Sequence, residues 1–185
     1  KHGITIIEDC ADSLGSWHDG RHLGHHGLVC CLSTQSQAVI SAGEGGFAAT
    51  DDVGIAARIA ALSGCYDHGF KRHFAAPESS VFEAIDLGLC PKYSLQMSNI
   101  MAALLLPQIA SLEARVKEAN RKHHLLTTRL AAIVDGGIAG SLALSLLGVP
   151  PETRPCLNSF CFLATLGPSA SEVLLSAARR RGVPL

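Results

Sequence analysis

The sequence has no marked excess of charge and no long apolar run, and these two absences exclude several classes of protein. Fifteen basic and sixteen acidic residues give a formal net charge of −1, so electrostatics gives no reason to expect nucleic acid or an anionic membrane as a partner. The longest stretch without a charged residue, 22–43, contains histidine, serine, threonine and glutamine side chains, which a membrane span avoids. We therefore expect no nucleic-acid partner and no membrane insertion.

A secretory leader and an internal repeat are also missing. The chain starts at Lys1 without an initiator methionine or the pattern of a signal peptide. Its seven cysteines, an odd number, are typical of reduced core thiols and predict a cytoplasmic protein. Both ends are abrupt, with a strand-like segment directly after Lys1 and mid-protein sequence before Leu185. The length is enough for one core, or for one domain and part of another, and the abrupt ends lead us to expect a fragment.

The most informative stretch runs from Leu28 to Asp52. An apolar strand-like segment, 28–32, leads into a polar run, 33–37, and a glycine turn at 43–46 precedes a second short strand, 47–50. Serine and threonine hydroxyls and exposed backbone N–H groups all donate hydrogen bonds, so this loop could cradle an anionic ligand. A hairpin that uses glycine only for its turn explains the same residues.

The first segment, 4–10, is a continuous apolar run that ends in two acids, Glu8 and Asp9. Such a run predicts a parallel strand buried on both faces. Ligands of open α/β sheets lie beyond the carboxyl ends of the strands, where both acids are expected. Alternatively, the two acids only end the strand or cap the next segment.

A group of histidines and cysteines follows in a loop-like segment, 12–27, and its continuation. Its members are His18, His22, His25, His26, Cys30 and Cys31. Imidazole and thiolate are zinc ligands, but no C-x-x-C spacing is present, and neighbouring residues of a strand point to opposite faces. We expect solvated loop histidines and no metal site.

The remaining chain predicts mostly helices. The acids 51–52 open a helix over 53–62, 64–91 has the length of a functional loop, and Ser98 caps a long helix to about Val134 that Pro107 kinks or splits. One apolar stripe on this helix consists of Leu112, Val116, Ala119, His123, Leu126, Leu130 and Ile133. A connection over 136–155, a strand over 160–166 and a helix over 171–181, ended by Gly182, look like the start of a second, α+β domain.

Three segments together resemble the DegT/DnrJ/EryC1/StrS family of pyridoxal-phosphate-dependent aminotransferases. They are IIEDCADSLGS at 6–16, GRHLGHHGLVCCLSTQSQAVISAGEGGFAATDD at 20–52, and YSLQMSNIMAALLLPQI at 93–109. The resemblance implies an α/β fold of the aspartate-aminotransferase type (fold type I). Residues 1–110 would be the C-terminal part of its large domain, and 111–185 a linking helix and the beginning of the small domain.

The resemblance also implies roles for individual residues. Asp9 matches the aspartate that pairs with the pyridine nitrogen of the cofactor, and Asp12 falls where the family usually has glutamine or histidine near the ring. Ser33 matches the hydroxyl that binds the cofactor phosphate, with Gln35 close enough in sequence to help. Ser94 stands where an asparagine often reaches the phosphate across the dimer interface.

One position departs from the family pattern. The Schiff-base lysine of the family falls at Ala38, and no lysine occurs between Lys1 and Lys71. A methyl group can neither hold the cofactor covalently nor shuttle a proton. Pyridoxal 5'-phosphate would thus be bound non-covalently at most.

The implied function is transfer of an amino group from an amino-acid donor to a nucleotide-linked keto-sugar, by a protein that is a homodimer when full length. Ala38 predicts that this activity is impaired or lost. Alternatively, the chain is a non-catalytic homologue that binds pyridoxal phosphate, its aminated form (PMP) or a sugar nucleotide. Relative to the family, the N-terminal part of the large domain and most of the small domain are missing, so we expect an incomplete site.

Overall fold

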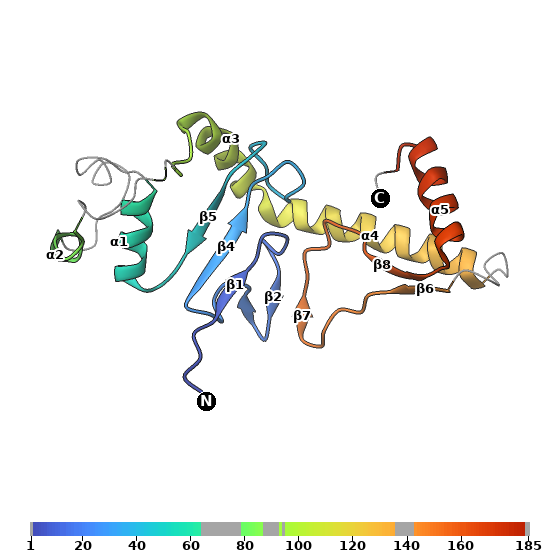
Figure 1. The fold of residues 1–185 in the computed structure, drawn as a ribbon, viewed down its shortest axis with the longest axis horizontal. Helices are drawn as coiled ribbons and strands as arrows, with labels where there is room; N and C mark the ends of the chain where they lie inside the picture. Colours follow the sequence, from blue (N-terminus) through green and yellow to red (C-terminus); the bar gives the residue numbers. More distant parts are fainter. Residues whose placement is uncertain (1, 64–78, 87–92, 94, 136–142, 184–185) are drawn as a thin grey trace.

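The computed structural model describes residues 2–63, 79–86, 93, 95–135 and 143–183 (Figure 1). Its elements in chain order are β1 (Ile7–Asp9), β2 (Trp17–His18), β3 (Arg21–His22), β4 (Val29–Ser33), β5 (Gly46–Ala49), α1 (Val53–Leu62), α2 (Ser79–Glu83), α3 (Asn99–Ala110), α4 (Leu112–Asp135), β6 (Ala143–Leu146), β7 (Thr153–Arg154), β8 (Phe162–Thr165) and α5 (Pro168–Arg180). Among the described helices, none is both long and apolar enough to cross a bilayer.

The sheet that carries the N-terminal part has the strand order β1-β4-β5. β1 and β4 are parallel, with Asp9 opposite Cys31, and β4 and β5 form an antiparallel pair. The parallel pairing expected of the first segment is therefore confirmed. It places the carboxyl ends of β1 and β4 at the same edge of the sheet.

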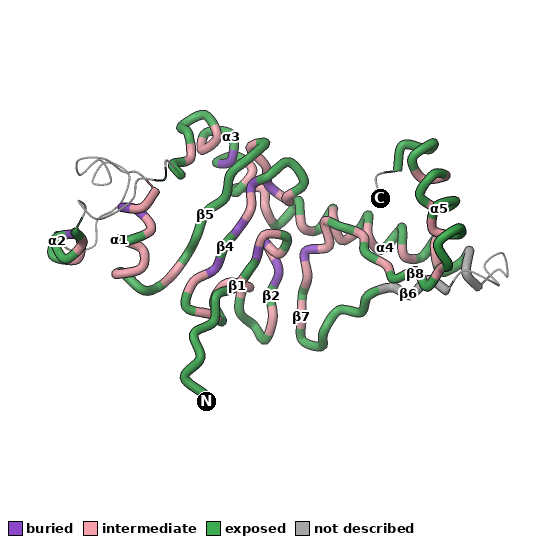
Figure 2. The backbone as a smooth tube through the Cα atoms, viewed as in Figure 1, coloured by how far each residue is buried: buried purple, intermediate pink, exposed green. Residues whose placement is uncertain are grey.

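The main core lies against one face of this sheet. Its buried members are Cys10, Leu14, Cys30, Leu32, Ile40 and Leu105. Alternation along β4 turns Cys30 and Leu32 into this core and leaves Cys31 exposed. Figure 2 shows the buried residues concentrated along β4 and around it.

The prediction that the first strand is buried on both faces is wrong for the described residues. Ile6 and Ile7 are 55% and 67% exposed, and β1 has only three residues. β4 is its single strand neighbour among the described elements. Ile7 lies on the open face of the sheet, and the core on the other face begins at Cys10 and does not include Ile6.

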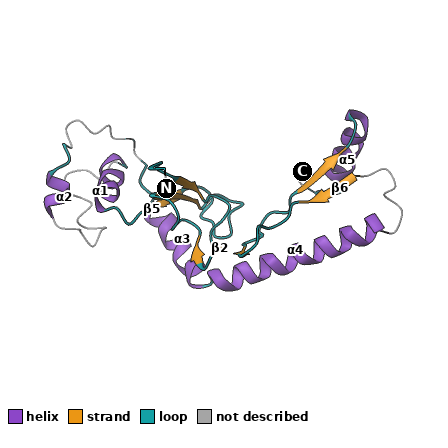
Figure 3. Ribbon diagram, turned by 90° about the horizontal axis from the view of Figure 1, so that it is seen from below, coloured by secondary structure: helices purple, strands orange, loops and turns teal. Residues whose placement is uncertain are grey.

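The long helix expected after Ser98 is two helices that meet at Ser111. The Ser98 hydroxyl caps α3 by accepting from the Met101 N–H at 3.2 Å. Pro107 lies inside α3, and the break comes four residues later, where the Ser111 hydroxyl donates to the carbonyl oxygens of Pro107 and Gln108. Figure 3 shows α4 leaving α3 at an angle and running as one long rod.

Other expectations have mixed outcomes. The helix over 53–62 is α1, capped by the Asp52 carboxylate, which accepts from the Ile55 N–H at 2.9 Å. The final strand and helix are present as β8 and α5. The expected connection over 136–155 instead contains β6 and β7, and β7 pairs with β2 inside what was expected to be a loop. Most of the expected functional loop, 64–91, lies outside the described residues.

Candidate functional site

Asp9 and Ser33 end two neighbouring parallel strands. Asp9 is paired in register with Cys31, and Ser33 lies two residues farther along β4. Side chains two residues apart on a strand share a face, so Ser33 lies on the same face as Cys31, the open face of the sheet. Strand geometry puts the Cα atoms of Asp9 and Ser33 roughly 8 Å apart. The structure therefore brings these two predicted residues to one edge.

Both side chains keep hydrogen-bonding capacity for a ligand. One carboxylate oxygen of Asp9, Oδ1, accepts from the Ala11 N–H at 3.1 Å, which leaves Oδ2 available. Ser33 Oγ accepts from the Gln35 N–H at 3.1 Å, so the hydroxyl proton of Ser33 remains able to donate. This edge thus offers a negative acceptor and a neutral donor.

The other predicted binding residues have less support. The side chains of Gln35 and Asp12 are exposed, and in the described part of the chain the hydrogen bonds of Gln35 are made by its backbone N–H and carbonyl. Ser94 lies outside the described residues.

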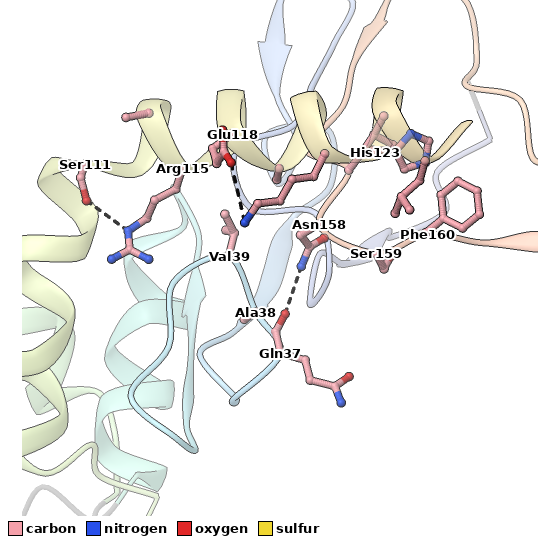
Figure 4. Close-up of a pocket in the computed structure, with 15 residues that line it drawn as sticks. Gln37, Ala38, Val39, Ser111, Arg115, Glu118, His123, Asn158, Ser159 and Phe160 are labelled. Atoms are coloured by element: carbon pink, nitrogen blue, oxygen red, sulfur yellow. Dashed lines mark hydrogen bonds and ion pairs between the residues drawn. The ribbon is translucent and has the colours of Figure 1, made fainter. Parts of the chain in front are cut away.

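Ala38 lies in a turn and lines a groove of about 700 Å³ (Figure 4). Its N–H donates to the Gln35 carbonyl at 2.9 Å. The preceding carbonyl, that of Gln37, accepts from Asn158 Nδ2 at 3.2 Å. The groove lies between this loop, α4 and segment 157–160, while Asp9 and Ser33 are not among its lining residues. Position 38 therefore borders the groove, and Asp9 and Ser33 lie outside it.

The glycine turn is a tightly packed part of the loop. Thr34 is fully buried; its N–H donates to the Gly45 carbonyl and its own carbonyl accepts from the Ala42 N–H. Gly43 and Gly45 have φ values of +91° and +114°, which favour glycine. A Cβ atom on Gly46 would lie 2.5 Å from the Leu32 carbonyl oxygen. The hairpin interpretation is therefore correct for β4 and β5, and the loop between them remains the candidate cradle.

Glu8 has a structural role, in agreement with the alternative interpretation of the two acids. Its carboxylate accepts from the backbone N–H groups of Gly24, His26 and Gly27. Burial disfavours the charged form of Glu8, but these donors, the Gly27 N–H first among them, outweigh burial and hold the pKa of the carboxyl below its ordinary value. Glu8 thus fixes the loop that leads into β4.

The expectation of solvated loop histidines is wrong for two of them. His22 is half-buried; its Nε2 accepts from the Gly15 N–H at 3.0 Å and its Nδ1 lies 2.6 Å from the Leu23 carbonyl oxygen. His18 contacts the Thr153 hydroxyl at 2.9 Å. Among the residues that the structure describes, no three His, Cys, Asp or Glu side chains are grouped closely enough to hold a metal ion.

The cysteines divide into two groups in the described part of the chain. Cys10, Cys30 and Cys156 are buried, while Cys31 and Cys161 are exposed. Burial, and then the negative charge of Glu8, raises the pKa of the Cys10 thiol to about 11. The expectation of core thiols is therefore right for three cysteines and wrong for two.

No pattern in the sequence predicted that residues 155–158 contribute to the site. Asn120 of α4 holds this segment through the Pro155 carbonyl and the Leu157 N–H, both at 2.8 Å, and the Ser16 hydroxyl accepts from the Cys156 N–H at 2.8 Å. Together they fix the position of Asn158 over the Gln37 carbonyl. These contacts join residues up to 140 positions apart, and no local sequence pattern signals them.

Comparison with known proteins places the chain among aminotransferases. The model of the DegT/DnrJ/EryC1/StrS aminotransferase family matches residues 1–141. L-glutamine:2-deoxy-scyllo-inosose aminotransferase of Streptoalloteichus tenebrarius is 33% identical over 134 residues, which cover 71% of this chain and 30% of that protein. L-glutamine:scyllo-inosose aminotransferase of Streptomyces griseus is 31% identical over 133 residues, which cover 72% of this chain and 31% of that protein. The chain spans about a third of the length of these relatives.

Solved structures show the same fold. A DegT DnrJ EryC1 StrS aminotransferase from Brucella abortus has a TM-score of 0.69 and 20% identity, covering 98% of this chain and 42% of that one. GDP-4-keto-6-deoxy-D-mannose-3-dehydratase of E. coli, solved with bound hydrated PLP, has a TM-score of 0.70 and 18% identity, covering 99% and 46%. The fold is thus a partial fold-type I α/β structure.

Proposed function

The chain belongs to the DegT/DnrJ/EryC1/StrS aminotransferase family, and from this premise we propose that it forms part of a pyridoxal 5'-phosphate site that lacks its covalent anchor. The observation that carries this proposal is the placement of Asp9 and Ser33 at adjacent ends of the parallel pair β1–β4. Position 38, where the family has its lysine, lies in the same loop as Ser33 and carries only a methyl group.

The family pattern implies three contacts to the cofactor, at its ring nitrogen, its phosphate and its aldehyde carbon. The residues present fit the first two. The available oxygen of Asp9 suits a protonated pyridine nitrogen, and the hydroxyl of Ser33 suits a phosphate oxygen. When bound, the cofactor supplies an electron sink for bond breaking at the amino-bearing carbon. Asp12, Gln35 and Ser94 are secondary candidates for contacts to the ring or phosphate.

Ala38 limits what this site can do. An amine at this position would have two tasks, to hold the cofactor and to carry a proton between substrate and cofactor carbons. The alanine methyl group offers neither a nucleophile nor a titratable proton. We expect the protein to bind the cofactor non-covalently and to transfer amino groups poorly or not at all.

The amino acceptor has two candidates. The family resemblance supports a nucleotide-linked keto-sugar, and the names of two relatives, inosose aminotransferases that use L-glutamine, support a keto-cyclitol. An Ala38→Lys variant given L-glutamine labelled with 15N at the α-amino group tests both. Mass spectrometry would show label in the amine formed from 2-deoxy-scyllo-inosose under the second proposal, and in the amino sugar formed from a nucleotide-linked keto-sugar under the first.

A non-catalytic role is the alternative. The same residues could serve a homologue that binds pyridoxal phosphate, its aminated form or a sugar nucleotide without turnover, which the substitution at position 38 supports. We also propose that the protein is cytoplasmic and that the full-length protein is a homodimer. We place the division between the large domain and the small domain at residue 110.

Borohydride reduction tests the central assignment of position 38. After incubation with pyridoxal 5'-phosphate and reduction, Ala38→Lys is expected to carry the cofactor on residue 38, identified by peptide mass spectrometry. Ala38→Met is the matched control, because methionine has similar length and no amine. Absence of a position-38 adduct in a folded Ala38→Lys protein would contradict the proposal.

A further inference from the structure

The groove behind position 38 has walls of unequal charge. Loop 33–43 and segment 155–160 contain no acidic or basic residue. The wall formed by α4 contributes two cations, Arg115 and Lys122, and one acid, Glu118. The groove is therefore bounded by an uncharged loop on one side and by a charged helix on the other.

Arg115 is available to a ligand. Its Nε donates to the Ser111 hydroxyl at 3.1 Å, and its terminal nitrogens make no ion pair with any residue that the structure describes. Figure 4 shows the guanidinium projecting from α4 toward the side of the groove where the Val39 loop lies. A guanidinium held through Nε keeps its terminal N–H groups for a carboxylate or phosphate.

The single acid of the groove is engaged by neighbours on its own helix. Glu118 accepts two bonds of 2.8 Å from Arg121, which does not line the groove, and forms a longer ion pair, of 3.8 Å, with Lys122. Arg115 and Lys122 are seven residues apart, so they lie on the same side of α4, about 10.5 Å apart along its axis. The groove is thus left with a net positive charge.

The wall of the groove opposite α4 contains a hydrogen-bond acceptor that has no donor among the described residues. Asn158 Oδ1 is the single buried side-chain nitrogen or oxygen atom without a partner among the described residues, while Nδ2 is bound to the Gln37 carbonyl. A buried acceptor without a donor costs about 1–3 kcal/mol. A ligand hydroxyl or amino group that moves the covering side chains aside would remove this cost.

We propose that this groove binds the anionic group, phosphate or carboxylate, of a reactant that approaches position 38. Arg115 is the principal contact, Lys122 adds charge, and Asn158 accepts from a hydroxyl or amino group of the same ligand. The identity of the ligand as a reactant rests on the proposed function, whereas its anionic chemistry rests on the groove. A nucleotide-linked sugar supplies phosphates, and an amino-acid donor supplies a carboxylate.

Calorimetric titration of the cofactor-free protein tests the inference with three probes. Uridine diphosphate represents the phosphate source, L-glutamine the carboxylate source, and myo-inositol a neutral polyol. We expect saturable binding of at least one of the two carboxylate- or phosphate-bearing probes, weakened by added salt. The probe that binds more tightly shows whether the anionic group is a phosphate or a carboxylate. Absence of saturable binding by both, or equally tight binding of myo-inositol, overturns the proposal.

Variants on one helix separate the groove from general charge. Arg115→Gln should weaken binding about tenfold and Arg115→Lys less, whereas Arg129→Gln, the same change on α4 in a different pocket, should have little effect. Lys122→Gln and Lys117→Gln form a second matched pair, since Lys117 lines another groove. Of these two, Lys122→Gln should weaken binding more. Equal weakening by Arg115→Gln and Arg129→Gln would overturn the proposal.

The two proposals can fail independently. The titrations use no cofactor and count no turnover, so Arg115-dependent anion binding would stand even if Ala38→Lys forms no cofactor adduct. Conversely, an adduct at position 38 with no Arg115-dependent binding would leave the proposed function intact and remove the groove from it.

Discussion

The ends and the middle of the loop between β4 and β5 differ in what surrounds them. At the ends, Thr34 is fully buried and Gly46 lies against the Leu32 backbone. In the middle, Ala38 lines an open groove, whereas Ile40, two residues later, is buried in the core. The ends therefore shape the loop and tolerate little change, while position 38 is open to a ligand.

This difference bears on the proposed role of position 38. The side chains of the residues proposed for the site, Asp9, Ser33 and Ala38, are exposed or half-buried, so packing does not specify them. The glycine turn is exposed but constrained, because a Cβ atom would clash at Gly46 and a positive φ would strain another residue at Gly43 or Gly45. A change of side chain at position 38 would therefore alter chemistry without altering the fold.

Glycine substitutions should show the largest contrast within this loop. Gly46→Ala places a Cβ atom 2.5 Å from the Leu32 carbonyl oxygen, and we expect it to lower the free energy of unfolding by about 3 kcal/mol. Gly43→Ala adds a Cβ with no described atom within 4 Å, at a φ of +91°, and should cost about 1 kcal/mol. Urea denaturation measures both. A larger cost at Gly43 would break the comparison.

Glu8→Gln should have the next largest effect. The two carboxylate oxygens accept three backbone N–H groups, and an amide NH₂ in place of one oxygen would oppose a donor. We expect a loss of about 2 kcal/mol in the free energy of unfolding, measured by urea denaturation at pH 7.

The same change has a defined pH dependence. Because the folded pKa of Glu8 is lowered from 4.5, its stabilising contribution is complete above pH 4.5 and is lost as the pH falls through the folded pKa. The difference in Tm between the unaltered protein and the Glu8→Gln variant should therefore be constant near pH 7 and shrink below pH 4.5. A difference that grows on acidification would contradict this role.

Asp9→Asn should alter ligand binding and leave stability nearly unchanged. The introduced amide is exposed and its oxygen can still accept from the Ala11 N–H, so we expect a change within about 0.5 kcal/mol in unfolding. The affinity of this variant for pyridoxal 5'-phosphate should fall at least about tenfold, because the negative partner of the ring nitrogen is lost. Asp51→Asn, the same change at another exposed aspartate, is the matched control in a fluorescence titration, and equal affinities of the two variants would remove Asp9 from the site.

Structural features that depend on neighbouring residues could be predicted from the sequence. The caps at Asp52 and Ser98 and the parallel pairing of β1 with β4 follow from residues near one another or from a buried apolar pattern. Pro107 likewise predicted that the long helix is kinked or split, although the break comes four residues later, at Ser111. The exposure of Ile7 depends on what packs against it, which the local sequence does not state.

The candidate site divides in the same way. The proposed roles of Asp9, Ser33 and Ala38 come from a family pattern that spaces such residues in this way. The Asn158 contact with the Gln37 carbonyl joins residues 121 positions apart and leaves no motif. The Glu118–Arg121 pair has the i, i+3 spacing of a helical ion pair, but its place beside a groove depends on how α4 lies against the loop and segment 157–160.

The central claim is that position 38 has lost the covalent chemistry while the cofactor contacts of Asp9 and Ser33 remain. The most direct test is to titrate the unaltered protein with pyridoxal 5'-phosphate, reduce the saturated complex with borohydride, and map it by mass spectrometry. The account predicts saturable, Asp9-dependent binding with no lysine modified stoichiometrically. Stoichiometric labelling of one lysine, or absence of saturable binding, would contradict it.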